Sequence, residues 1–426
     1  MYGLILFICG MATMILELAG VRIMSPFLGS THIVYTSIIG IIMASLSFGY
    51  WLGGRLSSKN PSFFKLSLFI FFSGIYILIL SCFQFNFLKY INNFDLSLII
   101  KSVLCSLLMF SLPSILLGII PPYLIQIAIN RLKNNINSGA IVGKYYAIST
   151  IGSILGTFLC GFYLIIHFGI DRIFFVLSCI LLICSILCIL VECIDKKKII
   201  NKKIFFIEII VLLIAIFCVL YFKYKPIMIF EDTIYSKTTP YSYIFVTKNK
   251  NRENNNNYIF LNHALSGRAV NSLPDDFVFG YIQKFYNFFI SKDKKDNMLI
   301  LGNAGGNLLS GILYHLNQNK IERVKIDVVE IDKYFTKVAR RYFKLPKKDS
   351  RVTFYYEDAR TFLNKYNNKK YDIIFFDIYT QDYIIPYYLI TKEVFQSLNS
   401  KLKEDGIFLI NVIGDRKSTR LNSSHG

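Results

Sequence analysis

The polar part of this sequence lacks cysteine altogether. The chain has nine cysteines, but the last is Cys218, and all nine lie in the apolar part that precedes Lys225. This distribution excludes a disulfide framework and a cysteine-ligated metal site from the part of the chain that follows.

Charged residues are also scarce, at 17% of the 426 residues against about 25% in an average soluble protein. Up to Lys225 the chain carries 17 Lys and Arg against 6 Asp and Glu, and beyond it 30 against 21. One uniform soluble fold is therefore excluded. The net charge of +20 does not indicate a nucleic-acid partner, because the lysines are scattered and no recognition motif accompanies them.

Long apolar stretches fill the first part. A bilayer-spanning helix needs about 17 to 25 residues, and stretches of at least this length lie at about 2–20, 33–54, 63–83, 97–129, 140–168, 172–192 and 204–222. The first is not expected to be a cleaved signal peptide, since it lacks a basic start and further spans follow at once. We therefore predict a transmembrane helical domain at 1–223, with the lipid bilayer as its partner.

Basic residues in the loops predict the orientation of the spans. They cluster at 55–65, 131–144 and 196–203, which agrees with six spans and a cytoplasmic N-terminus. The seventh span, 204–222, would then carry the polar part across the bilayer. The side of the membrane on which the polar part lies therefore stays open.

Two patterns within the spans concern helix packing and transport. Gly152 and Gly156 have the G-x-x-x-G spacing that permits close contact between helices. The segment Gly49-Tyr-Trp-Leu-Gly-Gly-Arg-Leu-Ser-Ser-Lys59 resembles the glycine-rich, basic loop after the second helix of major facilitator transporters. This resemblance implies a transporter-like helical bundle.

From Pro226 onward, short apolar runs alternate with turns and helix-like segments. Residues 227–246 and 258–270 are predicted as strands on either side of an asparagine-rich tip, and 276–291 as a helix. Further strands alternating with helices are predicted at 298–301, 325–329, 351–355, 372–376 and 407–411. That alternation is typical of a doubly wound, Rossmann-like parallel α/β sheet.

Residues with ligand-binding chemistry follow four of these strands. The turn Gly302-Asn303-Ala304-Gly305-Gly306 allows a ligand to approach the backbone at a helix N-terminus. Glu330 can accept hydrogen bonds from ribose hydroxyls, Asp358 can accept one from an adenine amino group, and Asp377 ends the fourth strand. Ligands bind at the carboxyl ends of such strands, so we predict an adenosyl-ligand site. Helix N-capping is the alternative role for Asp358 and for Asp377.

Several motifs resemble those of the spermidine synthases, the polyamine aminopropyltransferases, in their membrane-fused bacterial form. They are Ile15-Leu-Glu-Leu-Ala-Gly-Val-Arg-Ile-Met-Ser-Pro-Phe-Leu-Gly-Ser30, Tyr146-Ala-Ile-Ser-Thr-Ile-Gly-Ser-Ile-Leu-Gly156, Val329-Glu-Ile-Asp332, Glu357-Asp-Ala-Arg360 and Tyr371-Asp-Ile-Ile-Phe-Phe-Asp377. The resemblance implies a small β-domain at 226–270 and an S-adenosylmethionine-dependent methyltransferase-type sheet at 271–415. It also implies a multi-pass protein of the bacterial inner membrane.

The same resemblance implies a reaction. Decarboxylated S-adenosylmethionine, or S-adenosylmethionine itself, would be the co-substrate and putrescine or a related amine the acceptor, with no metal and no permanently bound cofactor. Asp377 would be the catalytic residue that attracts the protonated amine and takes its proton. The acceptor is expected at Tyr241, Tyr281 and Asp382, and the donor nucleoside at Gly302, Asn303, Gly305, Gly306, Glu330, Asp358 and Ala359. The oligomeric state, with self-association as one alternative, stays open.

The sequence departs from the family pattern mainly where the acceptor would bind. Ser242 stands in place of a glutamine and Phe279 in place of a tyrosine, while Asn303 and Ala304 replace an early acidic residue of the glycine turn. Two alternatives are therefore kept: methyl transfer from S-adenosylmethionine, and a membrane transporter or sensor with a non-catalytic nucleoside-binding domain. Residues 416–426 resemble translated sequencing-adapter read-through, so we expect the natural protein to continue differently after residue 415.

Overall fold

The computed structural model describes residues 1–412 apart from short segments. The residues left out are 30, 132–137, 169, 197–201, 225–232, 249–256, 262–263, 270–279, 292–295, 367 and 380–384. Asp382 and Phe279 therefore lie outside the described residues. The chain divides into two compact units, one ending at Ile229 and the other beginning at Phe230.

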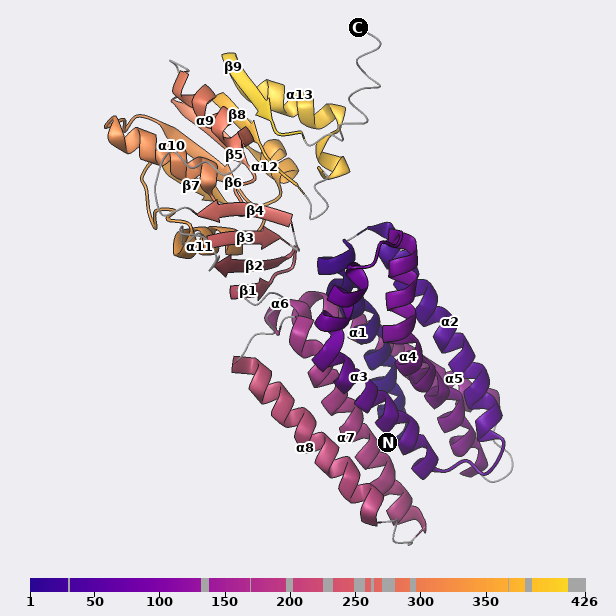
Figure 1. Ribbon diagram of the computed structural model, residues 1–426. Helices are drawn as coiled ribbons and strands as arrows, with labels where there is room; N and C mark the ends of the chain where they lie inside the picture. The colour runs from indigo at the N-terminus through magenta and orange to yellow at the C-terminus, as the bar shows by residue number, and fades with distance from the viewer. Residues whose placement is uncertain are drawn as a thin grey trace. The chain divides into compact units, whose positions relative to one another are not determined.

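The first unit is a bundle of long helices (Figure 1). Its elements are α1 (Tyr2–Leu28), α2 (His32–Ser57), α3 (Phe63–Asn92), α4 (Leu98–Arg131), α5 (Ser138–Leu159), a π-helical turn (Cys160–Leu164), α6 (Ile165–His167), α7 (Ile170–Lys196) and α8 (Lys202–Tyr224). In the described residues six helices are long and apolar enough to cross a bilayer, and the apolar run Phe205–Tyr221 of α8 is shorter. The predicted long apolar helices are confirmed, and six of them reach the length of a membrane span. The predicted seventh span, α8, stays a prediction.

Glycines of α5 allow close packing against α1. A Cβ atom at Gly152 would lie 2.1 Å from the carbonyl oxygen of Phe7, and one at Gly156 would lie 2.6 Å from that of Met11. The two helices therefore meet backbone to backbone, as the G-x-x-x-G spacing predicts.

Glycines of α2 likewise allow close packing against α4. A Cβ atom at Gly49 would lie 2.4 Å from the carbonyl oxygen of Ile115, and one at Gly53 would lie 2.6 Å from that of Ile119. Both glycines belong to the segment that resembles the transporter loop, but they lie within α2, where they permit this close helix contact.

Two carboxyl groups that the sequence analysis did not single out are buried in the bundle. Glu192 of α7 accepts a hydrogen bond from the Phe63 N–H at the start of α3 (3.1 Å). Glu208 of α8 is fully buried and accepts one from the Ser185 hydroxyl of α7 (3.0 Å). Since ionisable groups at membrane depth are costly unless they have partners, these contacts fix α7 against two neighbouring helices.

The second unit opens with a four-stranded antiparallel sheet whose strands lie in sequence order. They are β1 (Thr233–Thr238), β2 (Tyr243–Lys248), β3 (Asn257–Leu261) and β4 (Ala264–Ala269). The buried side chains of Ile244 and Val246 in β2 pack against Phe335 and Val338 of α11 (Lys333–Tyr342). This apolar contact fixes the small sheet to a helix of the larger one.

The larger sheet has five parallel strands in the order β7-β6-β5-β8-β9 (Figure 1). Their bounds are β5 (Asn297–Leu301), β6 (Lys325–Val329), β7 (Val352–Tyr355), β8 (Tyr371–Phe376) and β9 (Leu402–Ile410). All residues of β8 are buried, as expected for a central strand covered on both faces. The strand order reverses between β5 and β8, which places the topological switch point there.

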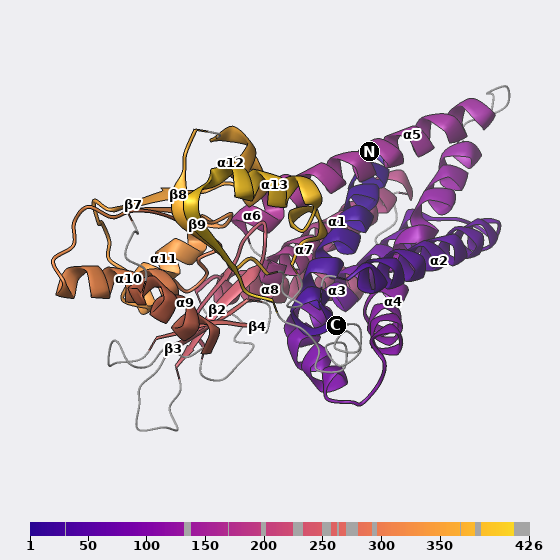
Figure 2. The same ribbon diagram turned by 90° about the horizontal axis from the view of Figure 1, so that it is seen from above.

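Helices cover both faces of this sheet (Figure 2). The helices α9 (Gly280–Ser291) and α10 (Asn307–Gln318) pack on one face, while α12 (Ala359–Lys365) and α13 (Lys392–Lys401) pack on the other. The predicted fold class, long apolar helices followed by a doubly wound parallel sheet, is therefore confirmed.

Candidate active site

The switch point brings Gly302 and Asp377 into contact. The Asp377 N–H donates to the carbonyl of Leu301 (2.8 Å), so the β5–β8 pairing continues beyond the end of β8. A Cβ atom at Gly302 would lie 2.2 Å from the Asp377 carbonyl oxygen, and the φ angle of Gly302 is +86°. Both features require glycine.

Glu330, which follows β6, holds the glycine turn in place. One of its carboxylate oxygens accepts hydrogen bonds from the N–H groups of Asn303 (3.0 Å) and Ala304 (3.1 Å), and the other accepts from Asp332 (3.1 Å). The side chain is 7% exposed. Burial raises the pKa of Glu330, against the opposing effect of these three N–H groups.

These bonds limit what Glu330 offers to a nucleoside. A carboxylate accepts about four hydrogen bonds, and the backbone supplies three donors. The carboxylate can therefore accept from about one further hydroxyl while it keeps all three backbone hydrogen bonds. Binding of both ribose hydroxyls requires one of the N–H groups to be released.

The rest of the turn consists of Gly305, Gly306 and the side-chain amide of Asn303. Gly306 caps α10 with a φ angle of +73°, and its N–H donates to the Asn303 carbonyl (2.7 Å). Gly305 is buried. The side-chain nitrogen of Asn303 is buried and has no hydrogen-bond partner within the described part of the chain. The turn therefore holds an amide donor available to a ligand.

Asp358 is the N-cap of α12, as the capping alternative predicts. One of its carboxylate oxygens accepts from the Thr361 N–H (3.1 Å), and the other accepts from the Tyr388 hydroxyl (2.9 Å). Ala359 is the buried first residue of α12. Desolvation, followed by the bond to Asp358, raises the pKa of Tyr388 to about 12. A contact with adenine stays a prediction.

The carboxylate of Asp377 is held by two neutral donors. The Tyr281 hydroxyl donates to one oxygen (3.0 Å) and the Asn411 side-chain amide donates to the other (3.0 Å). The described residues that follow, Ile378 and Tyr379, are not helical, so Asp377 does not cap a helix. Burial raises the pKa of Asp377, against the lowering effect of both hydrogen bonds.

The geometry separates the predicted acceptor residues. Tyr281, on α9, touches Asp377 directly. Tyr241 lies in the β1–β2 turn and is 53% exposed, and none of the contacts described above joins it to Asp377. The neighbouring Ser242 is buried beside the carboxyl group of Asp332, where its hydroxyl acts with that of Thr239 to oppose the raised pKa of Asp332, which is caused by burial.

Sequence reasoning missed Asn411 and Tyr388. Asn411 directly follows β9, and its N–H donates to the Phe376 carbonyl (3.0 Å). Ligands bind at the carboxyl ends of parallel strands, and applying this rule to the fifth strand would have found Asn411 too. Tyr388 lies in a short 3-10 turn, Tyr387–Leu389, and no sequence pattern pointed to it.

A known protein family matches part of the second unit. Residues 281–416 match the spermine/spermidine synthase domain family. The polyamine aminopropyltransferase of Leptospira interrogans is 23% identical over 418 residues, which cover 96% of this chain and 77% of that protein. The polyamine aminopropyltransferase of Agathobacter rectalis is 32% identical over 149 residues, 34% of this chain and 50% of that protein.

A methyltransferase is also among the relatives and has the same sequence identity as the Agathobacter rectalis protein. The N-terminal histidine N-methyltransferase of Emericella nidulans is 32% identical over 127 residues, which are 29% of this chain and 21% of that protein. The chain thus spans half or less of the length of the Agathobacter rectalis and Emericella nidulans relatives. The comparisons relate the residues around Tyr281, Glu330, Asp358 and Asp377 to the spermine/spermidine synthase domain, and a distant similarity to one aminopropyltransferase extends over nearly the whole chain.

Proposed function

We propose that the second unit transfers an aminopropyl group from decarboxylated S-adenosylmethionine to putrescine or a related amine. The observation that carries the proposal is the carboxylate of Asp377. It lies at the switch point, accepts from the neutral groups of Tyr281 and Asn411, and has no ion-pair partner among the described residues. A desolvated carboxylate without a cation favours the binding of one.

The chemistry follows from the charge of the acceptor. An alkylammonium group has a pKa of about 10 and cannot attack until it loses a proton. Asp377 binds the cation and then takes that proton, a role that its raised pKa supports. The amine lone pair forms a bond to the carbon next to the sulfonium. The carbon–sulfur bond breaks with its electron pair passing to sulfur, which leaves a neutral thioether.

Positioning is the other contribution of the protein. The turn at Gly302 and the carboxylate of Glu330 would hold the nucleoside, with the free Asn303 amide donating to it. The hydrogen bonds from Tyr281 and Asn411 fix the orientation of the Asp377 carboxylate and so set the direction in which it meets the amine.

A product assay on the full chain in lipid nanodiscs tests the proposal. Each donor, decarboxylated S-adenosylmethionine or S-adenosylmethionine, is incubated with putrescine, and the products are identified by mass spectrometry. We expect spermidine and methylthioadenosine from the decarboxylated donor, and a loss of about 100-fold to 10,000-fold in rate for Asp377→Asn. A methylated amine made only with the second donor would overturn the proposal.

Two other functions each have one observation in their favour. Methyl transfer is supported by the similarity to the Emericella nidulans methyltransferase. A transporter or sensor with a non-catalytic nucleoside-binding domain is supported by the departures from the family pattern at the acceptor positions, such as Ser242. Retained amine uptake by the Asp377→Asn chain would favour the second of these. We also propose the bacterial inner membrane as the location of the helical unit; its likeness to major facilitator transporters stays a prediction.

A further inference from the structure

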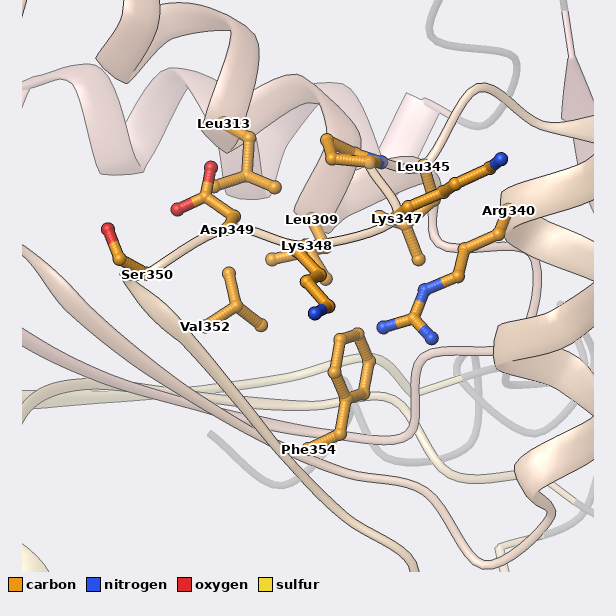
Figure 3. Close-up of a pocket in the computed structure, with 11 residues that line it drawn as sticks. Leu309, Leu313, Arg340, Leu345, Lys347, Lys348, Asp349, Ser350, Val352 and Phe354 are labelled. Carbon is orange, nitrogen blue, oxygen red and sulfur yellow. The ribbon is translucent and has the colours of Figure 1, made fainter.

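A second cavity lies away from the strand-end site. It has a volume of about 430 Å³ and is formed by α10, the end of α11, the loop that follows α11, and β7 (Figure 3). Leu309 and Leu313 of α10 and Val352 of β7 contribute apolar walls. Pockets for small molecules measure about 300 to 1,000 Å³, so this one suits a single-ring compound.

Three basic side chains, those of Arg340, Lys347 and Lys348, line this cavity. The Arg340 guanidinium lies over the ring of Phe354, with Cζ 5.3 Å from the ring centroid. Lys348 also lines the cavity, and Figure 3 shows its amine directed toward the side of the cavity formed by Phe354. The Arg340 Nε atom is buried and has no hydrogen-bond partner in the part of the chain that the structure describes.

The carboxylate in the cavity wall does not neutralise these charges. Asp349 accepts two hydrogen bonds from the Arg351 guanidinium, at 2.9 and 2.6 Å. This pairing holds the pKa of Asp349 below its usual range. Within the described residues, Arg340 and Lys348 have no acidic partner. The buried Arg340 Nε–H, which lacks a partner among the described residues, favours an anion that accepts a hydrogen bond from it.

We propose that this cavity binds a small organic anion with an apolar ring or branched carbon body. The carboxylate or phosphate group of the anion lies between Arg340 and Lys348, where a guanidinium can donate two parallel hydrogen bonds. The carbon body lies against Leu309, Leu313 and Val352. Neither the donor nucleoside nor the amine acceptor is required for this binding.

The cavity also touches the strand-end site at one point. The Leu345 side chain lines the cavity, and one of its methyl carbons lies 3.5 Å from where a Cβ at Gly306 would be. An anion that packs against Leu345 therefore contacts the residue that supports the glycine turn.

Phenyl phosphate is the probe for this site. Its binding to the full chain in phosphatidylcholine nanodiscs is measured by titration calorimetry, with empty nanodiscs as the blank. We expect saturable binding that weakens with added salt, and a dissociation constant about tenfold higher for Arg340→Gln and for Lys348→Gln, since each removes a charge-assisted hydrogen bond. Uncharged phenol is expected not to compete.

Lys347→Gln is the matched control. Lys347 adjoins Lys348 in sequence, but its amine points away from Phe354 (Figure 3). We expect its dissociation constant to change by less than about twofold, the effect of an exposed charge. Lys348 is exposed, so its replacement leaves the fold intact even if Arg340→Gln does not fold. No saturable binding, or equal affinity in the wild type, Lys348→Gln and Lys347→Gln, would overturn the proposal.

Discussion

Asp377 combines burial with a charge that has no ion-pair partner in the described residues. Because burial raises its pKa, the folded protein favours the protonated form more than the unfolded chain does. The contribution of Asp377 to stability is therefore most favourable below the unfolded-state pKa of about 3.9, and it is lost as the pH rises through the folded-state pKa. At neutral pH this residue costs stability.

Replacement of Asp377 by Asn tests whether the ionised side chain lowers the stability of the protein at neutral pH. Asn keeps the shape of the side chain but removes the buried charge. Its carbonyl can accept from Asn411 and its NH2 group can donate to the Tyr281 hydroxyl oxygen, so we expect a higher midpoint of thermal unfolding than the wild type at pH 8. The difference should shrink as the pH is lowered toward 4. Thermal unfolding of the full chain followed across this range measures it, and a variant that is less stable at every pH would contradict the assignment.

Asp349 provides a control, because its ionised form is expected to stabilise the protein rather than destabilise it. The hydrogen bond from Arg351 lowers its pKa, so its stabilising effect is present above the unfolded-state pKa and is lost as the pH falls through the folded-state value. We expect Asp349→Asn to unfold at a lower temperature than the wild type at pH 8 and to approach it in acid. The same direction of change in both variants would show that a general effect of charge removal is being measured.

At the scale of single elements, α12 depends on its first turn. Asp358 supplies both a cap to the Thr361 N–H and an acceptor for the Tyr388 hydroxyl. The cap is an observed structural role, whereas the contact with adenine is a prediction. The two roles can be separated because asparagine is also a good N-cap residue.

We expect Asp358→Ala to lower the free energy of unfolding by about 1 to 2 kcal/mol, while Asp358→Asn changes it by less than about 0.5 kcal/mol. Chemical denaturation of the full chain gives both values. If the donor dissociation constant rises in Asp358→Asn although its stability is kept, the carboxylate contacts the nucleoside. An unchanged constant would leave capping as its role.

Helix α5 offers a comparison between two glycines of one element. A Cβ at Gly152 would meet the Phe7 carbonyl oxygen at 2.1 Å, whereas one at Gly143 would have nothing within 4 Å. We expect Gly152→Ala to force α5 away from α1 and to lower the yield and unfolding temperature of the purified protein. Gly143→Ala should be neutral or stabilising, because alanine is favoured over glycine in a helix by about 1 kcal/mol. Equal behaviour of the two variants would refute the close packing of α1 and α5.

At the scale of the whole molecule, α8 decides the membrane topology. It lies alongside α7 (Figure 1), with Ala215 packed near Leu182 and Glu208 bonded to Ser185. The helix has 23 residues, and a helix of that length measures about 34 Å at 1.5 Å per residue, enough to cross a hydrocarbon core of about 30 Å. Lysines flank both ends of its apolar run, however: Lys202 and Lys203 precede it, and Lys223 and Lys225 follow it. Basic residues favour the cytoplasmic side of a membrane.

We therefore expect reporters fused after Lys203 and after Lys225 both to lie on the cytoplasmic side of the membrane. Paired alkaline phosphatase and green fluorescent protein fusions at both positions measure this, and a fusion after Arg55 calibrates the cytoplasmic side. Opposite signals after Lys203 and Lys225 would mean that α8 crosses the membrane. Aminopropyl transfer needs a donor made in the cytosol, so an external position of Lys225 would contradict the proposed activity.

The sequence-based predictions were accurate for features that depend on neighbouring residues, and they missed contacts between residues far apart in the chain. The predicted strands at 298–301, 325–329 and 372–376 agree with β5, β6 and β8 to within one residue, because buried parallel strands need continuous apolar runs. The spacing of Gly152 and Gly156 likewise predicted a close helix contact that is observed. The buried Glu192 and Glu208 were missed, since each sits in an apolar run and its partner lies on another helix.

The sequence by itself determined the division into an apolar and a polar part, the helical spans, the alternating strands and the register that places Gly302, Glu330, Asp358 and Asp377 at strand ends. Periodicity and chain length are local properties, and they suffice for these features. Only the tertiary structure decided that Asn411 and Tyr281 hold Asp377, that backbone groups occupy Glu330, and that Arg340 and Lys348 line one cavity with Phe354. Each of these depends on the distance between atoms far apart in the chain, which the packing of elements sets and local sequence does not.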